Sequence, residues 1–483
     1  PEMYAEMYEK AVEEDCDIVM CDVRILYIEE NRSSVVASYS RKEIDLSDYI
    51  AHGNNITYSV NKLFRRSIWE ENQYEKMLFE DISLIPALVT QYPAIGYVRK
   101  PFYQYYRRPN TISTSMVGDM VDIVQAFRNF LDTSNPQYRK EMVYCAAKQL
   151  YWNMTQSRAL FQADFIGLLK EYKKDFLLNP YLKKDGNVRK ILGFLEKEVI
   201  PDRIICVHFG RPIPEEYLQQ LGVDFPKTQL IDVEEGYYFP EQLPPVVRRA
   251  LEEGNLHFAE EYYALRILEK EGGIVLFPEM RANLNLKRLR LDHIFFGFAD
   301  QENLETGCFG ALQKHYVIQA LLDTYETDNI YNKALLPLGE RLRDFLMLHF
   351  QLKANGRKQL LQKEIQVYLP SVLSYDMKDG ENCAKRAGRP VPDGYEMVSG
   401  QVLKMWSDRI LENWNLYKQE LQTNPSKGKK VPPDPQPQLA SPQMQYELDR
   451  RIQEVVDNYE NSTCWRITKP VRMLARLFGK QGG

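Results

Sequence analysis

The sequence is poor in the residues that build metal centres and disulfide frameworks. Its 483 residues include only 6 histidines and 7 cysteines. The cysteines are scattered, odd in number and form no CxxC pair, and the histidines show no HExxH spacing. This pattern favours reduced thiols in a cytoplasmic protein, argues against a zinc site, and predicts ordinary structural or surface roles for the histidines.

An excess of one charge and long apolar runs are also lacking. Lys and Arg total 62 against 67 for Asp and Glu, a net charge of −5, which is too balanced to favour nucleic acid as the main partner. No apolar run approaches the roughly 18 residues of a membrane span, and no secretory signal opens the chain. We therefore expect a soluble or peripheral protein.

The composition is that of an ordinary globular protein, and the chain is long enough for several cores. Apolar residues make up 44% and charged residues 27%, and the length predicts about three domains. The first residue is Pro1 rather than Met, so we expect the chain to begin inside a longer reading frame. Periodicity and composition predict an α/β region over 1–118, a helical connector over 119–195, a second α/β region over 196–420, a Pro-rich linker over 421–445 and a helical basic tail over 446–483.

Local patterns predict the main elements of these regions. Met3, Met7 and Ala11 share one helical face ahead of a short strand that begins at Ile18. Further strands are predicted at 56–64, 94–108 and 199–210, and helices at 80–92, 121–131, 141–154, 164–177 and 258–271. Gly272 and Gly273 are expected to end the last of these helices.

Three motifs in the first α/β region occur in a fixed order: NKLFRRS at 61–67, FEDI at 79–82 and YYRRPNTIS at 105–113. Together they resemble the C-terminal half of the family 2 glycosyltransferase domain, an inverting A-type enzyme with a Rossmann-like sheet. The resemblance implies that Asp81 is the base that takes a proton from the acceptor hydroxyl, with Glu80 orienting it or contacting the acceptor. Substrate-binding roles follow for Asn61, Lys62, Arg107 and Arg108, the two arginines near the nucleotide diphosphate.

The residue types suit this chemistry, although plainer explanations exist for each of them. Inverting transfer needs a carboxylate to accept a proton and positive charge near the leaving diphosphate, and guanidinium groups match phosphate oxygens. An acidic pair opening a helix is, however, also favoured by the helix dipole. Asn61 and Lys62 could equally be a solvated strand end, and Arg107 and Arg108 an exposed basic one.

The same resemblance places the donor-binding strand and the Asp-x-Asp metal motif upstream of Pro1. It implies that a complete first domain binds Mg²⁺ or Mn²⁺ through ligands outside this chain. We therefore expect 1–118 to hold the acceptor side of an incomplete domain, inactive as it stands.

A second set of motifs lies at 200–217, 258–280 and 296–315 and resembles the family 32 sugar-binding domain of capsular polysaccharide and mannosyl-transfer enzymes. This chain has the strand, helix, double glycine and short strand of the family pattern, but not the residues that carry the family's chemistry. A His and a Trp of the family fall on Ile205 and His208, its Ser-Asp and Arg fall on Glu260-Glu261 and Ala264, and its Asp-x-Asp falls on Phe277-Pro278-Glu279.

The resemblance thus implies a second A-type unit with a degenerate site at Glu261, Phe277 and Glu279 and no bound metal. One carboxylate of the Asp-x-Asp position remains, whereas a cation bridging a diphosphate is typically held by one or two carboxylates plus the phosphates. An altered, metal-independent transferase that uses Glu261 or Glu279 is the competing interpretation. Glu279 could also be a solvated residue after a strand.

The tail carries five basic residues after 465 and no acidic ones: Arg466, Lys469, Arg472, Arg476 and Lys480. With apolar residues on one helical face, such a segment can lie on an anionic membrane surface. A helix docked on the protein and a solvated terminus are the alternatives. SxxWRITKPVR also resembles a tail of bacterial cell-surface polysaccharide glycosyltransferases.

We therefore predict two Rossmann-like units joined by a helical region, in a transferase that moves sugar from a nucleotide-sugar donor to a growing bacterial cell-surface polysaccharide or lipid-linked glycan. A cytoplasmic location, peripheral at the inner face of the plasma membrane, is expected. A noncatalytic glycan-binding or scaffold protein of polysaccharide assembly is the alternative.

Overall fold

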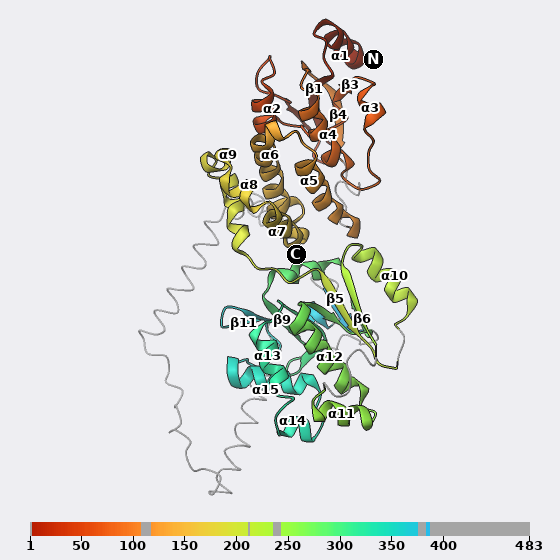
Figure 1. Cartoon of the computed structure of the whole chain (residues 1–483), viewed down its shortest axis with the longest axis vertical. Coiled ribbons are helices and arrows are strands. Elements are labelled where there is room, and N and C mark those ends of the chain that lie inside the picture. The colour runs from red at the N-terminus through yellow and green to blue at the C-terminus, as the bar shows by residue number, and fades with distance from the viewer. Residues whose placement is uncertain (1, 108–116, 211–212, 235–242, 375–382, 387–483) are drawn as a thin grey trace, which may run out of the picture. The chain divides into compact units, whose positions relative to one another are not determined.

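The computed structural model describes residues 2–107, 117–210, 213–234, 243–374 and 383–386 (Figure 1). Within these ranges the chain has mixed α/β content, with one sheet near each end of the described part and helices between them. Pro1–Val391 group into one compact unit. Arg108, the predicted linker and the predicted basic tail lie outside the described residues.

The first sheet is built around strand β1(Ile18–Tyr27). Strand β4(Ile95–Arg107) runs parallel to it, whereas β2(Arg32–Val36) and β3(Lys62–Phe64) pair antiparallel with its second and first halves. The predicted strand at 56–64 is therefore realised only in its last three residues. Turns replace the rest, because Lys62 donates its Nζ to the carbonyl oxygens of Asn55, at 2.7 Å, and Tyr58, at 2.6 Å.

Helix α1(Glu2–Glu13) confirms the predicted apolar face. Met7 is fully buried against Cys16, Val19 and Cys21, with Met3 and Ala11 beside it. The remaining helices of this part are α2(Leu46–His52), α3(Ile68–Glu71) and α4(Glu80–Gln91). The last of these is the predicted helix at 80–92.

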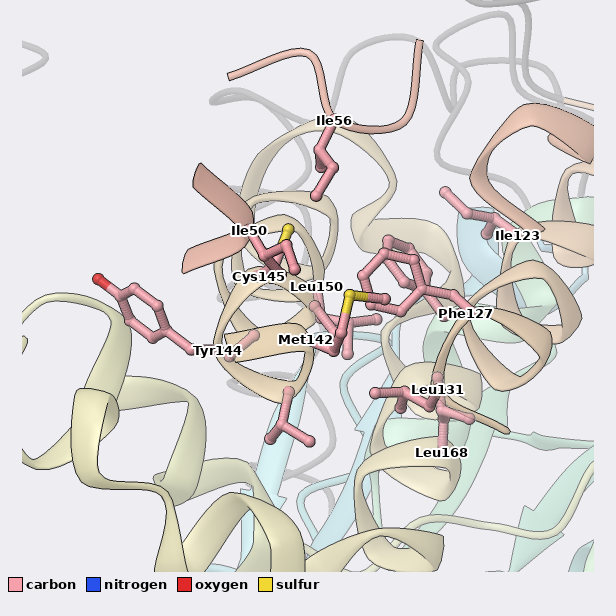
Figure 2. Packing of buried hydrophobic residues seen from close by; sticks show 14 of the residues in the cluster. Ile50, Ile56, Ile123, Phe127, Leu131, Met142, Tyr144, Cys145, Leu150 and Leu168 are labelled. Atoms are coloured by element: carbon pink, nitrogen blue, oxygen red, sulfur yellow. The ribbon is translucent and has the colours of Figure 1, made fainter. Parts of the chain in front are cut away.

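A run of helices follows, as predicted, and it shares its core with the first sheet. Ile50 of α2 and Ile56 pack with Phe127 of α5 and with Cys145 of α6 (Figure 2). Each such large side chain removed from water contributes roughly 2 to 3 kcal/mol, so the sheet and these helices stabilise one another. The predicted helix at 164–177 is broken at Tyr172 into α7 and α8. The helices and turns are η1(Gly118–Val121), α5(Asp122–Asp132), η2(Pro136–Tyr138), α6(Arg139–Trp152), the π-helical η3(Asn153–Ser157), η4(Ala159–Phe161), α7(Gln162–Glu171), α8(Lys173–Leu178), α9(Pro180–Lys184) and η5(Val188–Glu196).

The second sheet has seven strands in the order β11-β12-β9-β10-β7-β5-β6. The pairs β5/β6, β5/β7 and β12/β9 are parallel, and β10 runs antiparallel to both β7 and β9. Strands β8 and β13 pair antiparallel in a separate two-stranded sheet. The strands are β5(Arg203–Val207), β6(Gln229–Val233), β7(Gly273–Leu276), β8(Met280–Ala282), β9(Ile294–Phe298), β10(Leu304–Ala311), β11(Gln359–Leu361), β12(Ile365–Tyr368) and β13(Ala384–Arg386).

Both faces of this sheet are covered, which explains why β5 reads as a continuous apolar run. Ile205 and Val207 point into a core shared with α12, whereas Ile204 and Cys206 point into a core shared with α10. This is the alternation that a pleated strand imposes. The helices are α10(Glu215–Asp224), α11(Pro245–Glu252), α12(Leu256–Glu271), η7(Leu284–Leu291), α13(Tyr316–Asp323), α14(Ile330–Lys333), α15(Leu338–Phe350) and α16(Pro370–Leu373).

Helix α12 begins and ends at recognisable sequence signals. The side chain of Asn255 accepts a hydrogen bond from the backbone N of Phe258 at 3.3 Å, which caps the first turn. Gly272 ends the helix with φ +64°, and a Cβ atom there would lie 2.6 Å from the backbone N of Gln313. The predicted double-glycine stop is thus confirmed, since only glycine fits this conformation and this space.

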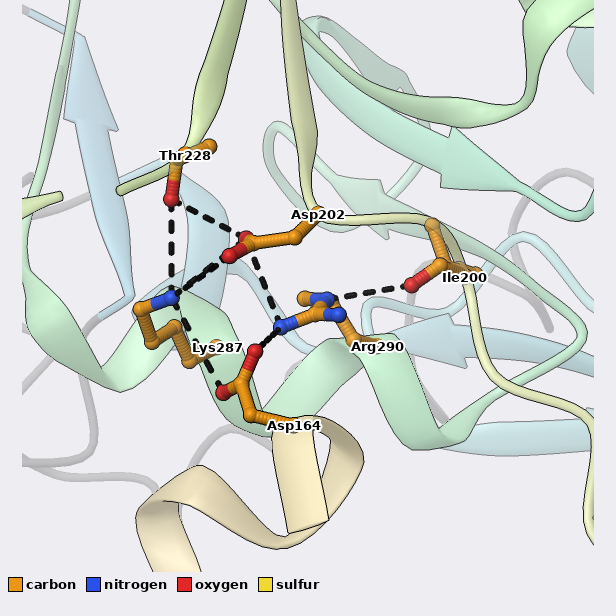
Figure 3. A network of polar contacts seen from close by, with 6 residues as sticks. All are labelled: Asp164, Ile200, Asp202, Thr228, Lys287 and Arg290. Atoms are coloured by element: carbon orange, nitrogen blue, oxygen red, sulfur yellow. Dashed lines mark hydrogen bonds and ion pairs between the residues drawn. The ribbon is translucent and has the colours of Figure 1, made fainter. Parts of the chain in front are cut away.

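A buried ion network ties α7 to η7 (Figure 3). Arg290 binds Asp164 through Nη1 at 2.5 Å and donates Nε to the carbonyl oxygen of Ile200 at 3.0 Å. Lys287, whose side chain is 2% exposed, lies 3.1 Å from Asp202 and 3.9 Å from Asp164. The network links the helical region to the second sheet through side chains that are far apart in sequence.

Two further predictions can be compared with the structure. The six cysteines in the described ranges are buried free thiols, as the composition predicts. None of the helices in those ranges combines the length and the apolar character that crossing a membrane requires.

Candidate functional site

Asp81 lies in the first turn of α4, behind a tight backbone turn. Phe79, the residue before the helix, has φ +65°, an uncommon left-handed conformation for a non-glycine residue. The Oδ1 atom of Asp81 accepts a hydrogen bond from the backbone N of Ile82 at 2.8 Å. The local sequence thus holds an acid at the positive end of a helix.

The environment of Asp81 brings its pKa closer to neutral pH. Burial raises the pKa of Asp81 to about 6, assisted by the negative charge of Glu80 and opposed by the Ile82 amide and the Lys62 ammonium group. A carboxylate with such a pKa is ionised at pH 7 yet remains basic enough to accept a proton. Displaced pKa values of this kind are common where acid and base chemistry takes place.

Lys62 is a basic residue within electrostatic range of Asp81, and it is almost fully buried. Its exposure is 7%, and its Nζ donates to the carbonyl oxygens of Asn55 and Tyr58 and, at 3.2 Å, to Oδ1 of Asn61. Burial lowers the pKa of Lys62 to about 7. The ammonium group is therefore anchored by the turn at 55–61 while its charge acts on Asp81.

Asn61 is fully buried and acts as a bridge between the sheet and Lys62. Its Nδ2 donates to the carbonyl oxygen of Cys21 at 2.7 Å and to Oγ of Ser38 at 3.0 Å. This placement favours a supporting role over a direct substrate contact through its side chain. Asp22 extends the network, because its Oδ1 accepts hydrogen bonds from the Ser38 backbone N at 2.7 Å and the Tyr97 hydroxyl at 2.6 Å.

The sequence motifs did not point to Asp22, Ser38 or Tyr97. Asp22 sits in an apolar strand and Tyr97 in another, and the parallel pairing of β1 and β4 brings them together. The one sequence signal for this network is Asp22, an acid within the apolar run of β1.

Two tyrosines, Tyr58 and Tyr74, lie within electrostatic range of Asp81. The rings of Tyr58 and Tyr105 stack with centroids 6.3 Å apart. Burial raises the pKa of Tyr58 and of Tyr74, and the negative charge of Asp81 contributes to both shifts. Aromatic faces with hydroxyl tips offer apolar and polar contacts at once.

Two more predicted residues lie at the margin of this site. Arg107 is exposed at the end of β4, and its charge lowers the pKa of Tyr58 against the upward effect of burial. Glu80 is partly buried next to Asp81 and adds negative charge to its surroundings. Glu80 and Asp81 are thus neighbours in the first turn of α4, with Lys62 within electrostatic range of Asp81 and Arg107 within electrostatic range of Tyr58.

In the second α/β part, the two acids of α12 bind backbone amides. Oε1 of Glu260 accepts from the backbone N of Phe209, and Oε2 of Glu261 accepts from the backbone N of Leu338, each at 2.7 Å. Their exposures are 1% and 0%. These bonds connect α12 to the end of β5 and to the start of α15, which is a structural use of both carboxylates.

His257 joins the two acids. Its Nδ1 lies 3.2 Å from Glu260 Oε2 and its Nε2 lies 3.4 Å from Glu261 Oε1. Hydrogen bonds to Glu260 and then Glu261 raise the pKa of His257 to about 10 against the effect of burial. His257 is therefore an imidazolium at neutral pH that offsets the buried negative charge, a role that helical i, i+3 and i, i+4 spacing makes possible.

The turn after β7 is filled by an aromatic ring. Phe277 is 1% exposed and its ring lies 5.8 Å from the His257 ring. Glu279 is partly buried in the same turn, and Arg281 donates from Nη1 to the carbonyl oxygens of Pro278, at 2.8 Å, and Met280, at 2.9 Å. Phenylalanine thus packs where the family resemblance places a metal-binding acid.

Comparisons with known proteins yield structural similarity alone. No family matches the sequence, and no curated protein matches it. A solved structure titled PaToxG glycosyltransferase is similar over 32% of this chain and 71% of its own, with 13% identity and a TM-score of 0.24. A glycosyltransferase involved in glycosylation of the major capsid of PBCV-1 is similar over 39% of this chain and 93% of its own, with 11% identity and a TM-score of 0.23.

Proposed function

We propose that this chain is part of a glycosyltransferase whose acceptor hydroxyl is activated by Asp81. The observation that carries the proposal is the partly buried carboxylate in the first turn of α4, which lies within electrostatic range of the anchored Lys62 side chain. The motifs at 61–67, 79–82 and 105–113, which resemble the family 2 domain, support it independently.

The proposed step is an in-line displacement with inversion. The acceptor oxygen forms a bond to the anomeric carbon as the bond from that carbon to the diphosphate oxygen breaks. The acceptor proton passes to a carboxylate oxygen of Asp81, and the nucleoside diphosphate leaves with the electron pair of the broken bond. General-base assistance of this kind contributes about 10²- to 10⁴-fold in rate.

The neighbours of Asp81 have distinct parts in this proposal. The negative charge of Glu80 helps to keep Asp81 basic, while Lys62 limits that rise and anchors the turn at 55–61. The stacked rings of Tyr58 and Tyr105, together with Tyr74, are proposed to contact the acceptor sugar. Arg107 and Arg108 are proposed to face the diphosphate.

The residues described around Asp81 do not suit a divalent cation. Among the described residues, Asp81 belongs to no group of three potential metal ligands, and the positive charge of Lys62 acts on it. As the family 2 resemblance implies, Mg²⁺ or Mn²⁺ is proposed to be held by ligands of the complete domain that lie outside this chain, and Asp81 would act only as the base.

The wider context is also part of the proposal. The donor is a nucleotide sugar, and the acceptor is a growing bacterial cell-surface glycan or lipid-linked glycan. The second α/β part is proposed to be a transferase-like module that binds glycan without turnover. The structural bonds of Glu260 and Glu261 support the absence of turnover. The basic tail would hold the protein at the inner face of the plasma membrane.

The test uses protein made from the complete open reading frame and a panel of nucleotide sugars. Release of nucleoside diphosphate in the presence of a polysaccharide acceptor is measured for the parent and for Asp81→Asn. Loss of about 100-fold or more is expected. Glu70→Gln, which alters an exposed acid in the first turn of α3, is the matched control and should retain full activity. Equal activity of Asp81→Asn and the parent would remove Asp81 from this role.

A noncatalytic glycan-binding protein is the second candidate, favoured by the structural use of the α12 acids. It predicts saturable binding of a polysaccharide acceptor with no release of nucleoside diphosphate from any donor, and equal binding by Asp81→Asn and the parent.

A further inference from the structure

A histidine and two acids meet where β5 and β6 end, on the edge of the second sheet. His208 directly follows β5, Asp232 lies in β6, and Glu234 directly follows β6. They form the one group of three potential metal-ligating side chains among the described residues. Asp232 lies 24 positions after His208, so no short sequence motif marks the group.

Strand pairing explains why the three side chains meet. The strands are parallel, with Cys206 opposite Asp232 and Val207 opposite Val233, and the backbone N of His208 donates to the carbonyl oxygen of Val233 at 3.0 Å. Residues two apart on a strand share a face. His208, Asp232 and Glu234 therefore project from the same side of the sheet edge.

The geometry is close to that of a coordination site. The ligand atoms all lie within 4.8 Å of one another, and Nε2 of His208 is 2.7 Å from Oδ1 of Asp232. Donors about 2.1 Å from one cation are about 3 to 3.5 Å apart. The exposed carboxylates can reach that spacing by rotation, whereas His208 is fixed at 6% exposure.

We propose that His208, Asp232 and Glu234 bind one divalent transition-metal cation of the Mn²⁺ or Zn²⁺ type. A neutral imidazole with two carboxylates matches the donor preference of these ions, and the carboxylates balance the double charge. Three protein ligands leave coordination positions for water or an oxygen ligand from solution. A cation here lies at the carboxyl ends of parallel strands, where open α/β sheets commonly bind ligands.

This site is separate from the turn after β7, where the family resemblance places the metal-binding acids and where Phe277 is packed instead. It is also independent of Asp81, which belongs to the first sheet. The proposal changes the expectation that the second α/β part binds no metal.

Binding is measured by titrating the whole 483-residue chain with Mn²⁺ and following the free ion by electron paramagnetic resonance, and with Zn²⁺ by calorimetry. One equivalent should bind well below about 1 mM. Asp232→Asn and Glu234→Gln should each weaken binding about tenfold or more. Glu216→Gln, which alters an exposed acid of α10, is the control and should bind as the parent does.

Coupling between bound Mn²⁺ and a nitrogen nucleus distinguishes coordination by His208 from nonspecific attraction of the cation to carboxylates. Pulsed resonance of bound Mn²⁺ should show coupling to an imidazole nitrogen that is lost in His208→Gln. If that variant does not fold, the exposed position Glu234 still decides the matter. The absence of saturable binding, parent-like affinity in Asp232→Asn and Glu234→Gln, or bound Mn²⁺ without nitrogen coupling would each overturn the proposal.

Discussion

Asp81 and Lys62 lie within electrostatic range of each other in the first α/β part. Burial raises the pKa of Asp81 to about 6 and lowers the pKa of Lys62 to about 7, and each charge opposes the shift of the other. Both groups therefore change protonation close to neutral pH. Such closeness is unusual for side chains whose ordinary pKa values are 3.8 and 10.5.

Asp81→Asn should stabilise the fold at neutral pH. The pKa of Asp81 is higher in the folded chain than in the unfolded one. The stabilisation that comes from binding this proton in the folded state is therefore fully present below about pH 4 and is lost as the pH rises through 6. Above pH 7 the ionised group costs up to about 3 kcal/mol. Urea unfolding should show this gain at pH 7.5 and little gain at pH 4. A destabilised Asp81→Asn at pH 7.5, with Glu70→Gln unchanged, would contradict the assigned environment.

Lys62→Met should remove a pH dependence of stability on the alkaline side. Because burial lowers the pKa of Lys62 to about 7, the unfolded chain binds the extra proton between pH 7 and 10.5. The parent should gain up to about 1.4 kcal/mol per pH unit in that window relative to Lys62→Met. Unfolding at pH 7, 8 and 9 measures the difference. Lys76→Met, at an exposed position, should follow the parent, and a parallel course for Lys62→Met would refute the prediction.

His257→Gln should destabilise the chain at neutral pH but not at high pH. Its raised pKa means that its stabilising effect is fully present below about pH 6.5 and is lost as the pH rises through 10. The unfolding midpoints of the variant and the parent should therefore converge by about pH 10 to 11. Half of the imidazole is exposed, so solvent screening limits the size of the effect. A gap that persists unchanged to pH 11 would show that packing against Phe277 matters more than the charge.

Asp164→Asn should destabilise the contact between α7 and η7 by about 3 kcal/mol. It leaves Arg290 and Lys287 with Asp202 as their remaining acid in the network of Figure 3. Guanidinium unfolding measures the loss, and hydrogen exchange should rise in both α7 and η7. Asp119→Asn, at an exposed position, is the control. A loss below about 0.5 kcal/mol would place the network among ordinary surface ion pairs.

Much of the architecture could be predicted because the relevant signals are local. The apolar face of α1, the helix α4 and the glycines that end α12 are each encoded within a few residues. The turns at 55–61 were missed because side-chain hydrogen bonds from Lys62 to the backbone hold them in place of a strand, a use of lysine that the apolar pattern does not reveal. The break at Tyr172 was missed as well.

The candidate site was only partly predictable, for the same reason. Motif order pointed to Asp81 and Lys62, but the buried bonds of Asn61 depend on Ser38, which a distant segment supplies. The group of His208 and Asp232 exists only through the register of β5 and β6. Residues brought together by strand pairing leave no spacing in the sequence to find.

The pH dependence of transfer by the complete-frame protein tests the central claim most directly. With saturating donor and acceptor, the rate should rise about tenfold per pH unit below an apparent pKa near 6 and then level off, because Asp81 must be ionised to accept the proton. Asp81→Asn should be slower by about 100-fold or more and lack this rise. A variant that keeps both the parent rate and the same acidic limb would contradict the account.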